Sequence, residues 1–256
     1  MRRLFYWYVP AAAALIATIV FAGGFYSYLR GDTGTAVSVS APARVNSTRP
    51  AAAQQQSAVV PVIIGDSLAR GMGDQTGLGI GGRFVDDLRA RRIATSDITN
   101  LAVNGARTAD LLELLGHRNV QVLLAQSNAI IISIGGNDLW GDNMRAAPTQ
   151  NPEPVMNAVS ERIVQIVRIV RAANPKARIY VIGLYNPFRT QPFGNLLTVL
   201  VANWNSRLTQ RFAADPNLTV VQTSDIFAWR NRLSEDQFHP SGEGYELIAR
   251  RIADTF

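Results

Sequence analysis

Short apolar segments alternate with helical patterns from residue 58 to the end of the chain, and this alternation is the feature that most constrains the fold. The segment AIIISI, residues 129–134, is apolar at nearly every position, as in a parallel strand that is buried on both faces. Further strands are expected at residues 59–64, 98–103, 178–182 and 218–221. Alternating strands and helices predict an α/β fold in which helices cover both faces of a parallel sheet.

Two of the expected helices have clear apolar faces. One begins near Val155 and stops at Asn174 and Pro175, and its apolar residues recur every three or four positions: Val155, Val159, Ile163, Ile166 and Val170. The last helix of the chain is expected to pack on the sheet through Leu247, Ile248 and Ile252. Pro61 cannot donate a ladder hydrogen bond, so the first strand is expected to begin at or near it.

The amino-terminal segment differs from the rest, because no charged side chain occurs between Leu4 and Leu29. At about 1.5 Å per helical residue, this span can cross a hydrocarbon core of roughly 30 Å, so residues 1–30 predict a transmembrane anchor. Aromatic residues lie at both ends of the span like interfacial belts, and Arg2 and Arg3 favour a cytoplasmic amino terminus. The rest of the chain would then be extracytoplasmic, in the periplasm or at the cell surface. The alternative is a cleaved signal peptide with residues 11–22 as its apolar region, which would give a secreted form, but a persuasive small-x-small cleavage site is missing.

Residues 31–57, GDTGTAVSVSAPARVNSTRPAAAQQQS, are mostly small and polar and show no sustained periodicity. Such a segment cannot bury enough apolar surface to offset the entropy lost on ordering, so it predicts a flexible linker. As a flexible coil, its ends would lie on the order of 30 Å apart. The linker would hold a globular domain, residues 58–256, just off the bilayer.

Composition excludes several classes of function. The net charge of +6 comes mainly from arginines spread along the chain, which is typical of a solvated surface with some preference for anionic membranes. No nucleic-acid partner is expected. The chain has no cysteine and only two histidines, His117 and His239, and neither lies in a metal-ligand motif. A zinc enzyme is therefore not expected.

A serine follows the first expected strand, at the edge of the sheet where ligands bind in open α/β folds. The run VVPVIIGDSLARGMGD, residues 59–74, changes from apolar to polar just before Ser67, and SEDQFHP near the other end contains Asp236 and His239. A serine hydroxyl becomes a nucleophile when an imidazole takes its proton and a carboxylate orients that imidazole. Taken alone, a serine after a strand is usually a helix cap or a turn residue, and a lone His-Pro usually lies in a loop.

Two further strand ends offer hydrogen-bond donors. NLAVNGART contains Gly105, where the missing Cβ lets a backbone N–H approach a ligand, and IIISIGGND contains the side-chain amide of Asn137. Fixed donors of this kind stabilise the negative charge that develops on a substrate oxygen in a tetrahedral intermediate. Each also has a purely structural interpretation, Gly105 as a turn former and Asn137 with Asp138 as an Asx turn or helix cap.

Together and in this order, the four segments resemble the motif blocks of the SGNH subgroup of the GDSL esterases and lipases. The resemblance covers roughly residues 59–256, through GDSL, the glycine of NGART, GGND and DQFHP. It implies that Ser67 is the nucleophile, His239 the base and Asp236 the residue that orients it. It also implies an oxyanion hole made of the Ser67 N–H, the Gly105 N–H and the Asn137 amide. The fold it implies is the family's flavodoxin-like, three-layer α/β/α arrangement, preceded here by one transmembrane helix.

The reaction expected is hydrolysis of a carboxylic ester through an acyl-serine intermediate, without a metal or organic cofactor. Four residues that follow strand ends either line an acyl pocket or pack the loops: Trp140, Tyr185, Pro187 and Phe188. The short polar connection after GGND, which contains Asn143, Arg145 and Gln150, favours a small pocket and therefore a short acyl chain. Outside the cytoplasm, this suggests O-acetyl groups on polysaccharide as the substrate.

Several alternatives stay open at the level of the sequence. Within the same family, the chain could be a lipase, a lysophospholipase, a thioesterase or an acyl transferase. A catalytically inactive, membrane-tethered module that binds glycans or a protein is the alternative from another class, although all five catalytic positions are present. An α/β-hydrolase nucleophile elbow is not supported, because Ser67 lies outside any G-x-S-x-G motif. Neither a dinucleotide-binding fingerprint nor a P-loop occurs in the chain.

Overall fold

The computed structural model describes residues 17–18, 58–140 and 151–256. The predicted membrane anchor, apart from residues 17 and 18, lies outside the described residues, and so does the predicted linker at residues 31–57. Within the described ranges, no helix is both long enough and apolar enough to cross a membrane. The polar connection that favoured a small pocket, residues 141–150, also lies outside these ranges.

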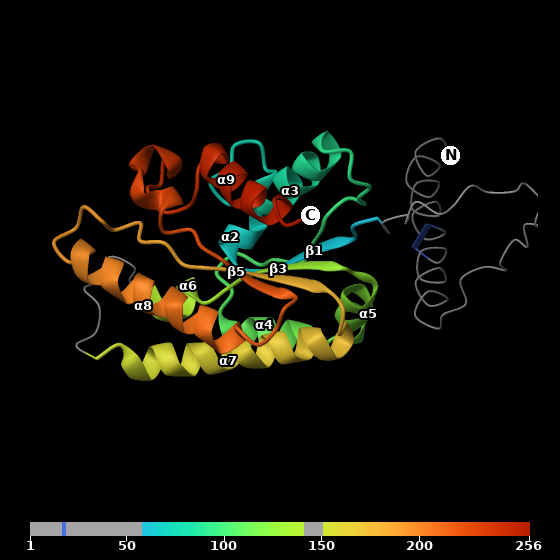
Figure 1. The fold of residues 1–256 in the computed structure, drawn as a ribbon, viewed down its shortest axis with the longest axis horizontal. Coiled ribbons are helices and arrows are strands. Elements are labelled where there is room, and N and C mark those ends of the chain that lie inside the picture. The colour runs from blue at the N-terminus through green and yellow to red at the C-terminus, as the bar shows by residue number, and fades with distance from the viewer. Residues whose placement is uncertain (1–16, 19–57, 141–150) are drawn as a thin grey trace, which may run out of the picture. The chain divides into compact units, whose positions relative to one another are not determined.

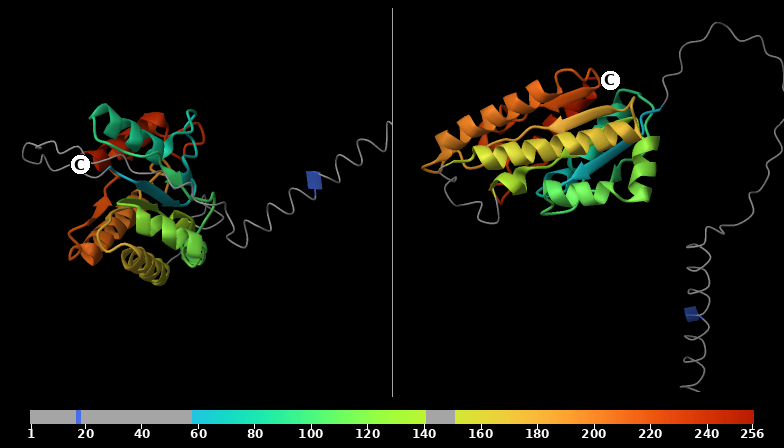
Figure 2. Two further views of the ribbon diagram at one scale, coloured as in Figure 1. Left: turned by 90° about the vertical axis from the view of Figure 1, so that its right-hand side faces the viewer. Right: turned by 90° about the horizontal axis from the view of Figure 1, so that it is seen from below.

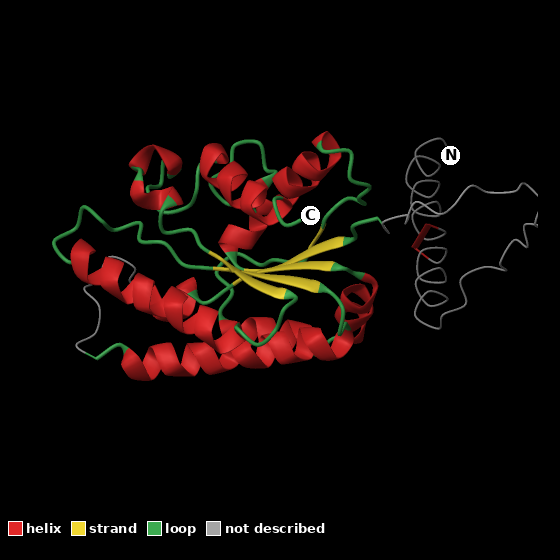
Figure 3. Ribbon diagram, in the orientation of Figure 1, coloured by secondary structure: helices red, strands yellow, loops and turns green. Residues whose placement is uncertain are grey.

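Five parallel strands form a sheet in the order β2, β1, β3, β4, β5. Figure 3 shows the strands between two layers of helices. They are β1 (Pro61–Gly65), β2 (Thr99–Asn100), β3 (Ala129–Ser133), β4 (Arg178–Ile182) and β5 (Leu218–Val221). This is the strand order of flavodoxin-like sheets, in which the winding reverses between β1 and β3. The predicted parallel sheet is confirmed, and β1 begins at Pro61 as its missing N–H requires.

The prediction for β2 was too long. The strand ends at Asn100, although the N–H groups of Leu101 and Val103 still donate to the carbonyls of Ile63 and Gly65 at 2.9 Å. The Asn100 side chain accepts a hydrogen bond from the Ala102 N–H at 3.0 Å and donates one to the Ala69 carbonyl at 3.1 Å. These side-chain bonds satisfy backbone groups next to the end of the strand, a local contact that an apolar pattern does not reveal.

Helices cover both faces of the sheet, as Figures 1 and 2 show. One layer contains α4 (Thr108–Leu115), α5 (Arg118–Gln126), α7 (Glu153–Ala173) and α8 (Gly194–Phe212). The other contains α2 (Ser67–Arg70), α3 (Gly79–Ala90) and α9 (Gly242–Ala253). Three short helices lie in the loops, namely α6 (Gly136–Trp140), η1 (Ile226–Ala228) and η2 (Arg230–Arg232). The described domain therefore has the predicted three layers.

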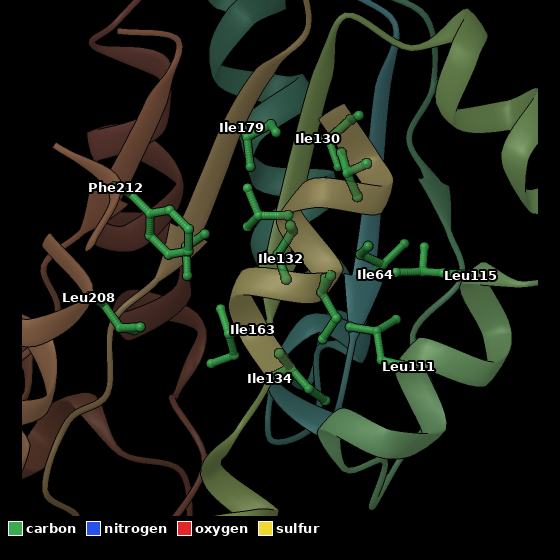
Figure 4. Packing of buried hydrophobic residues seen from close by; sticks show 14 of the residues in the cluster. Ile64, Leu111, Leu115, Ile130, Ile132, Ile134, Ile163, Ile179, Leu208 and Phe212 are labelled. Atoms are coloured by element: carbon green, nitrogen blue, oxygen red, sulfur yellow. The ribbon is translucent and has the colours of Figure 1, made fainter. Parts of the chain in front are cut away.

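Alternate residues of each strand pack against opposite helix layers. In β1, Ile64 packs with the layer that contains α4 and α7, whereas Ile63 packs with α3 and α9. All five residues of β3 are buried, as expected for a central parallel strand. Figure 4 shows Ile130 and Ile132 of β3 among side chains from both neighbouring strands and from the helices on one face.

The long helix α7 follows the predicted pattern with one exception. Val159, Ile163, Ile166 and Val170 are buried against the sheet, but Val155 is 42% exposed, and Met156 takes the buried position of the first turn. The first turn of the helix thus packs on the core through Met156, one residue after the predicted position. In α9, Ile248 and Ile252 are fully buried as predicted, and Leu247 packs at the margin of the core.

Gly65 lets β1 and β3 approach each other closely at their carboxyl ends. Its φ is +136°, and a Cβ at this position would lie 1.8 Å from the Ser133 carbonyl oxygen. The next residue, Asp66, donates its N–H to that same oxygen at 2.9 Å. A glycine is therefore required immediately before the turn that carries Ser67.

Candidate active site

Ser67 lies at the carboxyl end of β1, where the winding of the sheet reverses. It is the first residue of α2, and Asp66 caps this helix by accepting a hydrogen bond from the Leu68 N–H at 3.1 Å. Gly71 ends α2 after one turn, in the left-handed conformation with φ 95°. The tight turn presents Ser67 at the edge of the sheet where α/β folds bind ligands.

His239 and Asp236 lie in the loop between η2 and α9, and contacts within the loop hold them in place. The Ser234 N–H donates to the His239 carbonyl at 2.8 Å. His239 Nε2 lies 2.9 Å from Ser67 Oγ, and His239 Nδ1 lies 2.6 Å from Asp236 Oδ2. The structure therefore brings three residues that are far apart in the sequence into one continuous chain of hydrogen bonds.

The hydrogen bonds around Asp236 keep it ionised. Partial burial acts to raise its pKa, but hydrogen bonds from His239, from the Ser234 hydroxyl and from the Phe238 N–H outweigh this effect and lower the pKa to about 2. A carboxylate only accepts hydrogen bonds, so Asp236 selects the tautomer of His239 with the proton on Nδ1. In that tautomer, Nε2 is free to accept the proton of Ser67.

Asn137 lies in α6, at the carboxyl end of β3, and its side chain reaches the loop that follows β2. Its Nδ2 donates a hydrogen bond to the Ala106 carbonyl at 2.9 Å. An amide nitrogen carries two hydrogens, so one remains for a substrate oxygen after this bond has formed. The bond also fixes the direction of the amide, which a donor to a developing oxyanion requires.

Gly105 lies in the loop between β2 and α4 with φ +78°, and a Cβ there would meet no atom within 4 Å. A glycine is thus favoured here by the positive φ of the backbone, and not by a lack of space for a side chain. Among the described residues, its N–H has no hydrogen-bond partner. Gly105 lines a depression of about 360 Å³ together with Asn104 and His117, and it is not among the residues that line the cavity beside Ser67. Its role as an oxyanion donor therefore stays a prediction.

A cavity of about 50 Å³ lies beside Ser67. Its lining includes the predicted residues Trp140, Tyr185 and Pro187, together with Asn137 and His239. Aliphatic side chains from the ends of β3 and β4 complete much of the wall, namely Ile134, Ile182 and Leu184. The cavity is thus small and largely apolar, next to the hydroxyl of Ser67.

Phe188 does not line this cavity, so the loop-packing interpretation holds for it and not the acyl-pocket one. Its ring packs behind the wall instead, with its centroid 6.5 Å from that of Trp140 and 5.9 Å from that of Phe238. Phe238 takes the predicted place of Phe188 in the lining. The motif DQFHP contained the signal for this, because Phe238 directly precedes His239 in the chain.

Asp66 and Ser133 form a polar part of the lining that the sequence analysis did not assign. Both are buried, and Ser133 Oγ donates to Asp66 Oδ1 at 3.3 Å. Burial is the largest influence on Asp66 and raises the pKa of its carboxyl to about 7, against hydrogen bonds that act to lower it. The position of Asp66 next to Ser67 was visible in the motif, but its burial depends on the neighbouring strand β3.

Serine hydrolases use a hydroxyl, an imidazole and a carboxylate that are hydrogen-bonded in this order, with an amide donor nearby. Here the arrangement sits on a flavodoxin-like α/β sheet and not on an α/β-hydrolase elbow. The chain belongs to the GDSL-like lipase/acylhydrolase family, whose model matches residues 63–247.

Two curated proteins of Bacillus species are similar to this chain in sequence. The uncharacterized protein YpmR of Bacillus subtilis is 34% identical over 203 residues, which cover 76% of this chain and 80% of that protein. The spore germination lipase LipC of Bacillus licheniformis is 27% identical over 205 residues, covering 74% and 92% respectively. The matched regions are consistent with the family assignment.

Solved structures show the same fold at lower sequence identity. The lipase Lip_vut3 from a goat rumen metagenome has a TM-score of 0.64 at 21% identity, covering 77% of this chain and 96% of that chain. A family 3 carbohydrate esterase of Clostridium thermocellum has a TM-score of 0.58 at 18% identity, covering 77% and 94%. A lipase and a carbohydrate esterase thus share this fold, so the fold by itself does not select a substrate.

Proposed function

We propose that this protein is a serine esterase that hydrolyses carboxylic esters through an acyl intermediate on Ser67. The observation that carries the proposal is the hydrogen-bond chain from Ser67 Oγ to His239 Nε2 and from His239 Nδ1 to Asp236. Membership of the GDSL-like lipase/acylhydrolase family supports it. A catalytically inactive binding module would have no need for this chain at the mouth of a cavity.

In the first half of the reaction, His239 Nε2 takes the proton of Ser67 while Oγ attacks the ester carbonyl. The ionised Asp236 stabilises the imidazolium that forms. The tetrahedral intermediate then collapses, the ester C–O bond breaks, and His239 gives its proton to the departing alcohol. In the second half, water attacks the acyl-Ser67 ester with His239 again as the base, which releases the acid and restores the serine.

The negative oxygen of each tetrahedral intermediate requires fixed donors. Asn137 Nδ2 supplies one in this mechanism, directed by its bond to the Ala106 carbonyl. The Ser67 N–H at the start of α2 and the Gly105 N–H supply the others, and neither has a partner among the described residues.

The assignment of Ser67 is tested by treating the full-length protein with a fluorophosphonate. We expect the adduct on Ser67, and we expect Ser67→Ala to abolish both labelling and ester hydrolysis. Ser96→Ala is the matched control, because Ser96 is exposed and its hydroxyl donates to the neighbouring Asp97 carbonyl, away from Ser67 in the sequence and outside the cavity lining. An adduct on another residue, or full activity of Ser67→Ala, would contradict the proposal.

The cavity beside Ser67 supports a short acyl chain as the preferred substrate. Its volume of about 50 Å³ is far below the range of about 300–1,000 Å³ that drug-sized ligands occupy. The rings of Trp140, Tyr185 and Phe238 form part of its wall. Each methylene of an acyl chain contributes about 0.8 kcal/mol only if it is buried, and this cavity offers room for few.

A series of p-nitrophenyl esters tests this preference. We expect kcat/KM to be highest for acetyl to butyryl esters and to fall beyond about six carbons, since the cavity formed by the described residues beside Ser67 has room for only a short chain. Trp140→Ala should move the optimum toward longer chains, whereas Trp229→Ala, a change at a strongly exposed ring, should not. A maximum at eight carbons or more in the wild-type enzyme would contradict the short-chain proposal.

As the physiological substrate, we propose O-acetyl groups on extracytoplasmic polysaccharide. A transmembrane anchor at residues 1–30 and a linker at residues 31–57 would present the domain outside the cytoplasm. A lipase or lysophospholipase is the second candidate, supported by the apolar wall of the cavity and by the similarity to the spore germination lipase LipC. Release of fatty acid from a lysophospholipid at an efficiency comparable to that for short esters would favour this second function.

A further inference from the structure

A buried charged cluster lies next to the oxyanion donors but outside the Ser67, His239 and Asp236 chain. It joins Asp138 in α6, Thr108 at the start of α4 and Arg162 in α7. Asp138 Oδ2 accepts the Thr108 N–H at 2.9 Å, and Asp138 Oδ1 accepts the Thr108 hydroxyl at 2.5 Å. Arg162 bonds to both partners, with Nε 2.6 Å from Thr108 Oγ1 and Nη2 3.1 Å from Asp138 Oδ1.

The cluster is more than a surface ion pair. The Asp138 side chain is 5% exposed and Thr108 is fully buried, while Arg162 reaches in from the half-exposed side of α7. A buried carboxylate is tolerated only when its charge is paired and its oxygens accept hydrogen bonds. Arg162 pairs the charge of Asp138, and Thr108 and Arg162 donate hydrogen bonds to its oxygens. Removing one partner leaves the others unsatisfied, so the cluster holds its members in a single arrangement.

The position of the cluster connects it to catalysis. Asp138 directly follows Asn137, and Thr108 lies three residues after Gly105. The Asn137 amide bonds to the Ala106 carbonyl, so two adjacent contacts join the loop after β3 to the loop after β2. These two loops carry the proposed oxyanion donors, and their relative position decides whether both donors reach one oxygen atom.

We propose that Asp138, held by Thr108 and Arg162, is a positioning residue that sets the geometry of the oxyanion site through Asn137 and the Gly105 loop. The inference rests on the proposed esterase function. Asp138 touches neither substrate nor Ser67 in this account. Its effect is confined to the stabilisation of the tetrahedral intermediates, because the donors it positions act mainly on that charge.

The same helix offers a matched control. Arg171 of α7 pairs with Asp215 through Nε and Nη2, at 3.0 and 2.8 Å. Asp215 lies between α8 and β5, near the amino ends of the strands and thus at the opposite edge of the sheet from Ser67. Asp215→Asn therefore removes a charged contact of α7 without touching the oxyanion loops.

The first measurement is the steady-state kinetics of p-nitrophenyl acetate hydrolysis by the full-length protein. In Asp138→Asn, the new amide group faces the Thr108 and Arg162 donors, and we expect kcat to fall about 10- to 100-fold with KM nearly unchanged. Arg162→Lys should retain more of kcat than Arg162→Met, because the lysine keeps a charge near Asp138. Asp215→Asn should leave kcat unchanged, whatever stability it loses.

A double-mutant cycle with Asn137→Ala separates positioning from a general structural role. If Asp138 acts through Asn137, Asp138→Asn should lower kcat much less on the Asn137→Ala background than on the wild type. Equal losses on both backgrounds, an unchanged kcat in Asp138→Asn, or a loss seen only in KM would each overturn the inference. Should Asp138→Asn fail to fold, the Arg162→Lys and Arg162→Met pair is measured on both backgrounds instead.

The outcomes distinguish this inference from the proposed function. A wild-type protein without ester hydrolysis and without labelling of Ser67 refutes the esterase itself. An active wild type whose kcat is insensitive to Asp138 and Arg162 refutes only the positioning role.

Discussion

Asp66 is a buried carboxyl group whose burial disfavours the charged form. Its carboxyl lies between α2 and β3, 6% exposed, and burial raises its pKa from 3.8 to about 7. The folded state therefore binds this proton more tightly than the unfolded state does. Its contribution favours folding at acidic pH and is lost progressively as the pH rises from about 4 to about 7.

Asp66→Asn should remove this pH dependence while keeping an oxygen to accept the Leu68 N–H. We expect the free energy of unfolding of the variant, relative to the wild type, to rise by roughly 2–3 kcal/mol between pH 5 and pH 8. Urea unfolding at the two pH values measures the difference. Asp74→Asn is the control, because hydrogen bonds from Arg83 and Thr76 outweigh the effect of partial burial and lower the pKa of Asp74 to about 2, so it is ionised at both pH values. An equal change at both pH values in Asp66→Asn would refute the expectation.

At the scale of single residues, the motif order predicted which side chains meet but not all of their neighbours. Ser67, Asp236 and His239 carry their chemistry in their identity, and short motifs placed them at loop positions. Phe238 and Phe188 are both aromatic residues beside such motifs, yet only Phe238 lines the cavity. That choice depends on side-chain packing between two loops, which no spacing within either loop encodes.

At the scale of elements, α7 shows how much one apolar face contributes. Ile163 lies in the buried cluster with β3 and β4 residues, and it is completely inaccessible to solvent. We expect Ile163→Ala to lower the free energy of unfolding by about 2–5 kcal/mol, through lost burial and the cavity left behind. Denaturant unfolding followed by circular dichroism measures the loss.

Val155→Ala is the comparison within the same helix. Val155 has the same periodic spacing in the sequence, but it is 42% exposed. We expect its replacement to change the free energy of unfolding by less than about 0.5 kcal/mol, as for ordinary surface sites. Similar losses for the two variants would contradict the burial that the structure assigns to each position.

The predicted lengths of the strands agree with the structure except at β2. β3, β4 and β5 were predicted to within one residue. β3 is buried over its full length and β4 over four of its five residues, as expected for apolar strands inside a parallel sheet. β2 is an edge strand whose regular pairing ends at Asn100, although the N–H groups of Leu101 and Val103 still donate to β1. The apolar pattern therefore located β2 but overestimated the length of its regular pairing.

At the scale of the whole molecule, the amino-terminal anchor is the main untested expectation. We expect the intact protein to remain in the membrane fraction after carbonate washing, because an uncharged span from Leu4 to Leu29 is long enough for a bilayer. Protease should reach the carboxyl-terminal domain only from the outer face. A chain that begins at residue 58 is the control and should be released by the wash. A soluble mature form beginning near residue 23 would instead identify a cleaved signal peptide.

The sequence by itself determined the class of fold and the chemistry available to the site. A parallel strand that is apolar at every position must be buried on both faces, and helices on each side of the sheet provide that burial. The three-layer α/β arrangement therefore followed from the sequence pattern alone. The hydroxyl, imidazole, carboxylate and amide groups of the site follow from residue identity in the same way. These features are local, since each depends on a few neighbouring residues.

Only the tertiary structure decided what those groups meet. The contact between Ser67 and His239 joins positions 172 residues apart, and the contact of Asp138 with Thr108 joins two different strand ends. The size of the cavity and the burial of Asp66 likewise depend on side chains brought together from β1, β3 and β4 and from the loop before α9. Distances between segments that are remote in the chain are set by side-chain packing and by the hydrogen bonds between strands, and a local sequence pattern encodes neither.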